Sequence, residues 1–224
     1  MTLVLLAILA VEIVILSGSG WFMSRARLGR VVTIHLVMII CFGGLLGKFG
    51  PLVSNYGNVW YAAVVAAQLM LLDRYGRQAA KASLPRGWLA VSVVFAATYP
   101  LSHAAILPGN EAIGGAVVAL AGHRPQIVIA SYAAFGLMIE TMIITYAMLR
   151  PLSRGTAPVA AAVAAQIMDS VVFFPIAFGD LGVDFVVTAM VSGAIIKIPA
   201  TLVLVAVGFA ADGVRAHFGG AVRA

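Results

Sequence analysis

Charged side chains are scarce in this chain: Asp, Glu, Lys and Arg together make up only 10% of its 224 residues, whereas 62% are hydrophobic. Soluble domains carry roughly 25% charged residues. Together with a mean hydropathy of +1.07, this scarcity excludes an ordinary soluble domain and predicts an integral membrane protein. Apolar runs recur along the whole length, so we expect one transmembrane domain over residues 1–224.

Several chemical signals are also missing. Cys41 is the only cysteine, which excludes an intrachain disulfide and a thiolate metal site, and we expect no metal or other cofactor. The chain has no phosphate-binding loop for ATP, no His-Glu-x-x-His and no Gly-x-Ser-Gly. Ala177-Phe178-Gly179-Asp180 lacks the first glycine of the Gly-x-Gly-Asp motif of intramembrane aspartyl proteases. We therefore predict that the protein is not an enzyme, with an intramembrane acid-pair enzyme and a non-catalytic channel as alternatives.

A helix needs about 20 mostly apolar residues to cross a bilayer. Seven segments meet this requirement and predict an all-α, polytopic helical bundle with six to seven transmembrane helices: 1–23, 31–50, 56–73, 87–107, 126–149, 157–178 and 184–210. The segment 112–122 is shorter, and we expect a re-entrant or interfacial helix there. Because Glu12 lies in the first span and arginines follow it directly, we expect a retained helix rather than a secretory signal.

Basic residues predict the orientation, because cytoplasmic loops carry an excess of Lys and Arg. One set of loops and the C-terminal tail hold eleven of them: Arg25, Arg27, Arg30, Arg74, Arg77, Lys81, Arg86, Arg150, Arg154, Arg215 and Arg223. The opposite loops hold only Arg124. We expect a multi-pass protein of the cytoplasmic (inner) membrane with its N-terminus outside and its C-terminus in the cytoplasm. Since these residues follow topology rather than one face, we expect no nucleic-acid partner.

Three ionisable residues fall near the middle of predicted spans: Glu140, Asp169 and Lys197. Charges inside a bilayer are costly and usually mark a functional site. We expect the three at similar depth, with the lysine between the two carboxylates, where transporters place substrate and coupling ion. The alternative is a buried pair that only locks helix packing. Lys48, at the outer end of the second span, is likewise unexplained by topology.

The residues around Asp169 follow a helical pattern. Gln166, Asp169, Ser170 and Phe173 share one helix face, and Pro175 and Pro199 each leave a backbone carbonyl without its donor, which we expect near the cluster. In the second span, Gly43 and Gly47 have the small-xxx-small spacing that allows close helix packing. Such small residues would also allow a homodimer.

Three stretches carry a resemblance to a known family. They are Gln68 to Lys81, Ala130 to Glu140, and Gln166-Ile167-Met168-Asp169-Ser170 through Phe178 with Lys197 downstream. They resemble the queuosine-precursor transporter family, also called the vitamin uptake transporter family. The likeness covers about residues 36–209, which makes the span at 1–23 an addition to the family core.

The resemblance implies a function. Members of this family import 7-deazaguanine bases such as queuine, preQ0 and preQ1 for tRNA modification. It implies a substrate site in which Asp169 accepts two N–H groups of the base, Gln166 serves its carbonyl, Phe173 or Phe174 stacks on the ring and Glu140 meets an amine. The remaining members of the expected substrate-binding set are Lys197, Ser170 and Lys48.

The energy source stays open at this point. Transport is ion-coupled, facilitated, or driven by a separate module. The alternative function is therefore a substrate-binding membrane subunit for a vitamin or nucleobase that needs a separate ATPase.

Overall fold

The computed structural model describes residues 10, 11, 13, 14, 25–43, 46–49, 52–55, 57–100 and 125–221. Its long helices are α2 (Arg25–Gly43), α3 (Asn58–Tyr75), α5 (Ser83–Thr98), α7 (Pro125–Leu149), α8 (Thr156–Phe178) and α9 (Val183–Ala221). Short elements join them: α4 (Arg77–Lys81) and the 3-10 turn η2 (Gly179–Leu181). The predicted all-helical membrane bundle is confirmed, with one small β-hairpin added.

The hairpin lies where the second span was expected to continue. Helix α2 ends at Gly43, and β1 (Leu46–Phe49) pairs antiparallel with β2 (Leu52–Asn55), with Lys48 opposite Val53. The predicted helix to residue 50 is therefore wrong at its end, and Gly43 and Gly47 do not share a helix. Glycines weaken a helix, and a proline within it removes a hydrogen bond. The run from Gly43 to Pro51 holds four glycines and ends in a proline, so a continuous helix is unfavourable there.

Three helical segments of the described chain are long and apolar enough to cross a membrane: Pro125–Leu149, Thr156–Leu181 and Val183–Ala210. They coincide with the last three predicted spans. Helices α3 and α5 cover most of the spans predicted at 56–73 and 87–107. The span at 1–23, apart from four helical residues, and the segment 112–122 lie outside the described residues.

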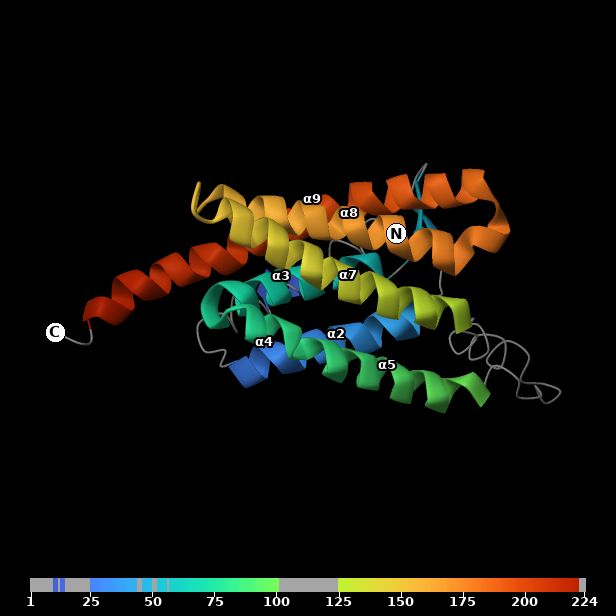
Figure 1. Cartoon of the computed structure of the whole chain (residues 1–224), viewed down its shortest axis with the longest axis horizontal. Coiled ribbons are helices and arrows are strands. Elements are labelled where there is room, and N and C mark those ends of the chain that lie inside the picture. Colours follow the sequence, from blue (N-terminus) through green and yellow to red (C-terminus); the bar gives the residue numbers. More distant parts are fainter. Residues whose placement is uncertain are drawn as a thin grey trace.

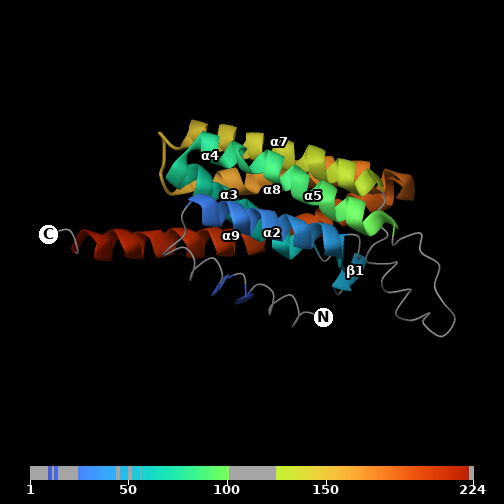
Figure 2. The same cartoon turned by 90° about the horizontal axis from the view of Figure 1, so that it is seen from below.

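Helix α3 forms the centre of the bundle. Every residue from Tyr61 to Leu72 is buried, which is typical of a helix that is apolar on all sides. Helix α2 packs on α3 and α5, α7 packs along α8, and α9 packs on both α3 and α8, whereas α7 approaches α3 and α5 at only a few points (Figures 1 and 2). The bundle thus has two groups, α2–α3–α5 and α7–α8, joined mainly through α9 and also by direct contact of α3 with α8.

The two ends of the bundle differ in charge. The start of α2, the α3–α4 junction, the α7–α8 loop and the end of α9 all lie at one end, on the left of Figure 1, and the β-hairpin and the α8–α9 turn lie at the other. The arginine-rich segments of the sequence therefore gather at one end, called the basic end below. This arrangement is the one that the loop-charge pattern predicts, and the side of the membrane stays a prediction.

Candidate functional site

The central feature of the candidate site is a buried ion pair. Nζ of Lys197, on α9, lies 2.5 Å from Oδ2 of Asp169, on α8. The two side chains are only 1% and 5% exposed. Burial of either charge alone would be costly, so each group compensates the other. The prediction that these two residues lie together is confirmed.

Aromatic rings surround the ammonium group. The ring centres of Tyr61 and Phe174 lie 5.4 and 5.5 Å from Nζ of Lys197, within the range of cation–π attraction. Gly193 allows this arrangement, because a Cβ atom at that position would lie 3.0 Å from two atoms of the Phe174 ring. Phe173 packs edge-on to Phe174, with ring centres 5.5 Å apart.

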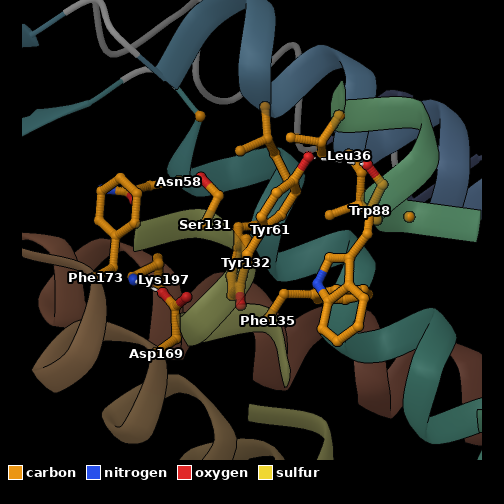
Figure 3. Close-up of a pocket in the computed structure, with 14 residues that line it drawn as sticks. Leu36, Asn58, Tyr61, Trp88, Ser131, Tyr132, Phe135, Asp169, Phe173 and Lys197 are labelled. Atoms are coloured by element: carbon orange, nitrogen blue, oxygen red, sulfur yellow. Dashed lines mark hydrogen bonds and ion pairs between the residues drawn. The ribbon is translucent and has the colours of Figure 1, made fainter. Parts of the chain in front are cut away.

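A pocket lies beside the ion pair and is lined by all six long helices (Figure 3). Its lining residues are Leu36, Ile39, Gly57, Asn58, Tyr61, Gly87, Trp88, Val91, Ser131, Tyr132, Phe135, Asp169, Phe173 and Lys197. The walls are mostly apolar and aromatic, with few polar groups, which is the usual character of a small-molecule site. The cavity volume is about 30 Å³, room for about two water molecules.

One wall of the pocket is the seam between α5 and α7. The Tyr132 hydroxyl donates to the carbonyl oxygen of Trp88 at 3.2 Å and also hydrogen-bonds the Ser92 hydroxyl. The ring centres of Trp88 and Tyr132 lie 6.1 Å apart. Because these helices approach each other at few points, these side chains make much of the contact across the seam.

Gln166 and Ser170 lie behind the pocket rather than in its wall. Nε2 of Gln166 donates to Oγ1 of Thr201 at 2.6 Å, so this amide group is engaged within the helix pair α8–α9. Oε1 of Gln166 and Oγ of Ser170 are buried and have no hydrogen-bond partner in the described structure. Of the predicted stripe, Asp169 and Phe173 line the pocket, and Gln166 and Ser170 do not. Phe174, which was also expected at the substrate, does not line the pocket either.

Glu140 does not join the central pair. Its carboxylate pairs with Lys81 of α4 and lies 3.9 Å from Arg77, and its side chain is 37% exposed. The prediction that Lys197 lies between two carboxylates is therefore wrong. The position of a residue along a span gives its depth in the membrane, but it does not give the face of the helix that carries its side chain. A role for Glu140 in substrate binding stays a prediction.

A second polar cluster ties α3 to α7 near the basic end. Arg150 lies 3.3 Å from Oδ1 of Asp73, and the hydroxyl of Tyr146 donates to the same oxygen. The guanidinium carbon of Arg150 lies 5.6 Å from the Tyr146 ring centre. Together with the Glu140–Lys81 pair, this cluster connects α3 and α4 to α7 through polar side chains.

Two further expectations concern the prolines of α8 and α9 and the side chain of Lys48. Pro175 and Pro199 are exposed, so their rings do not belong to the buried cluster. The position of the two freed carbonyls near the cluster stays a prediction. For Lys48 the structure describes only the backbone in β1, and its side chain lies outside the described part.

Sequence reasoning missed most of the pocket wall, in particular Asn58, Tyr61, Trp88 and Tyr132. Each is a polar or aromatic residue inside or at the edge of an apolar run, which is the signal that could have drawn attention to them. Ser131 and Phe135 fall within a stretch that carries the family resemblance, without a role assigned to them. Among the described residues, no group of three metal-binding side chains is found.

A comparison with known protein families shows which family the chain belongs to. The model of the family described as "putative vitamin uptake transporter" matches residues 55–211. The chain belongs to this family. The match to the vitamin uptake transporter family runs from the end of β2 into α9 and includes both residues of the buried pair. No curated protein and no solved structure matches the chain. Family membership and the apolar helices make it a membrane transporter for vitamin uptake, and this membership argues against an enzyme.

Proposed function

We propose that the protein imports a 7-deazaguanine base, a queuosine precursor such as queuine, preQ0 or preQ1, across the cytoplasmic membrane. The observation that carries the proposal is the buried Asp169–Lys197 pair in the wall of an aromatic pocket. An acceptor and a donor thus lie side by side among flat apolar surfaces. This combination suits a planar, polar-edged heterocycle better than an aliphatic or strongly charged vitamin.

The hydrogen-bonding edge of a guanine-like base offers two adjacent N–H donors and one carbonyl acceptor. A carboxylate has two acceptor oxygens, and an ammonium has three donors. Asp169 can accept from the two N–H groups while Lys197, 2.5 Å away, donates to the carbonyl. Lys197 therefore replaces Gln166 as the partner of the carbonyl, because the Gln166 amide is bonded to Thr201. Bonds to charged groups are stronger than neutral ones.

The apolar part of the base has its own partners. Phe173, Phe135 and Trp88 line the same pocket, and aromatic rings pack favourably against flat heterocycles. A ring between such side chains would place its polar edge at the ion pair. This arrangement keeps the role of Phe173 that the resemblance implies.

The pocket in this structure is too small for a base. A volume of about 30 Å³ holds about two waters, so entry requires side chains or helices to move. The α7–α8 pair contacts α3 and α5 less extensively than α7 contacts α8 or α2 contacts α3, and the pocket lies between these groups. Movement of α7–α8 against α2–α3–α5 would open it, in the manner of rocking bundles in transporters.

Uptake of radiolabelled queuine into proteoliposomes tests the proposal. We expect accumulation with the wild-type protein and at least tenfold slower uptake with Asp169→Asn. The matched control is Asp184→Asn, the same change at an exposed carboxylate at the start of α9, which should transport normally. Equal uptake in Asp169→Asn and the wild type would contradict the proposal.

Two further outcomes are informative. Because Asp169→Asn leaves a buried, unpaired lysine, the double variant Asp169→Asn/Lys197→Met provides a neutral pair that avoids this cost, and it too should lose uptake. Tight binding without uptake in the purified protein would favour the alternative of a binding subunit that needs a separate ATPase.

A further inference from the structure

Tyr61 carries a hydroxyl group that lacks a hydrogen-bond partner. The side chain lies in the first turn of α3 and is 8% exposed, and its oxygen is buried without a partner in the described structure. Buried hydroxyls are nearly always paired, and an unpaired one lowers the stability of the folded state. Such a group in a native protein needs an explanation.

The position of this hydroxyl is specific. Tyr61 lines the pocket, its ring centre lies 5.4 Å from Nζ of Lys197, and its hydroxyl is close enough to the Asp169 carboxylate for electrostatic interaction (Figure 3). The two groups lie within hydrogen-bonding proximity, yet the hydroxyl makes no hydrogen bond of normal geometry with that carboxylate in the described structure. It lies where a ligand bound to Asp169 would offer further polar atoms.

Other unpaired groups provide a comparison. The described structure contains four buried side-chain atoms without a partner, and the other three belong to Gln68, Gln166 and Ser170. None of these three residues lines the pocket, whereas Tyr61 does. A phenylalanine at position 61 would fill the same space against Lys197 without a polar atom, so packing alone does not account for the hydroxyl.

We propose that the Tyr61 hydroxyl is a third hydrogen-bonding group for the carried ligand, beside Asp169 and Lys197. The inference rests on the proposed function, because it places the base in this pocket. When N–H groups of the base occupy the carboxylate, the hydroxyl donates to an acceptor on the ligand, a ring nitrogen or a carbonyl oxygen. Tyr61 then selects heterocycles that carry an acceptor next to their N–H edge.

Tyr61→Phe tests the inference because stability and affinity should change in opposite directions. The variant loses only an oxygen that is unpaired in the empty protein, so its melting temperature without ligand should equal or exceed that of the wild type. Loss of a ligand contact should weaken queuine binding about tenfold, measured by titration calorimetry. The ligand-induced rise in melting temperature should shrink accordingly.

Tyr146→Phe is the matched control. It removes the same atom from a hydroxyl that is already bonded, to Asp73 near the basic end. We expect a lower melting temperature and unchanged queuine affinity, the reverse of the Tyr61 pattern.

Three results would overturn the inference. A less stable Tyr61→Phe protein with unchanged affinity would make the hydroxyl a structural partner of Asp169. A stable variant with unchanged affinity would leave the hydroxyl without a ligand role. If the wild type binds neither queuine, preQ0, preQ1 nor guanine, the proposed function fails and the inference with it. The first two failures are distinguishable from the third, because in them the wild type binds.

Discussion

The ammonium of Lys197 lies 2.5 Å from a carboxylate oxygen of Asp169, and together they join α8 to α9 in the interior of the bundle. The pair is electrically balanced while the pocket is empty. Buried pairs often contribute little net stability compared with apolar residues of the same volume. Their retention here, in the wall of a pocket, is therefore better explained by binding than by folding.

The two charges should depend strongly on each other. Lys197→Met removes the partner of a buried carboxylate, which typically costs about 3–5 kcal/mol. We expect a markedly lower melting temperature in detergent and a loss of queuine binding. Adding Asp169→Asn to this variant should restore most of the stability without restoring binding. Additive losses in the double variant would contradict a coupled pair.

Gly87 should control the size of the pocket. A Cβ atom there would lie 2.6 Å from Cδ1 of Leu36 and 3.0 Å from Cε1 of Phe135, and all three residues line the pocket. Gly87→Ala should push these side chains into the cavity and weaken queuine binding several-fold. The overpacking should also lower stability by about 1–3 kcal/mol.

Gly136→Ala is the control for this change. Its added Cβ would lie 3.5 Å from the nearest atom, in Trp88, an ordinary contact. Alanine is also the better helix former by up to about 1 kcal/mol, so this variant should be as stable as the wild type or more stable. Equal ligand affinity in Gly87→Ala and Gly136→Ala would show that the first glycine does not set the pocket.

The variant Glu140→Gln tests whether Glu140 only pairs with Lys81, as in the structure, or also contacts the amine of the substrate, as the family resemblance implies. Glu140 pairs with Lys81 and does not line the pocket, and partly exposed ion pairs contribute little energy. We expect less than a twofold change in affinity for both preQ1, which carries an amine, and preQ0, which carries a nitrile. A selective loss of preQ1 binding would instead place Glu140 at the amine of the bound base.

Part of this arrangement was predictable from the sequence. The spans that became α7, α8 and α9 are long and strongly apolar, so hydropathy alone located them. Asp169 and Lys197 were expected together because each is a lone charge at a similar depth. Burial without a partner is so costly that two such groups of opposite sign tend to meet.

Other features depend on information that hydropathy does not hold. The glycines and proline from Gly43 to Pro51 interrupt an otherwise apolar run, and the β-hairpin there was missed because composition alone still favoured a span. Hydropathy also does not show that the face of α7 that carries Glu140 meets the basic residues of α4 rather than Lys197. Tyr61 and Trp88 lie in apolar runs, and hydropathy does not show that they meet in one pocket lined by six helices.

The most direct test of the account is a thermal-shift measurement on the purified protein with queuine, preQ0, preQ1, guanine and adenine. A ligand that binds the folded state raises its melting temperature. We expect a rise with bases that have the guanine-like edge, little or no rise with adenine, and no rise in Asp169→Asn/Lys197→Met. An equal rise with adenine, or a rise that persists in the double variant, would contradict the account.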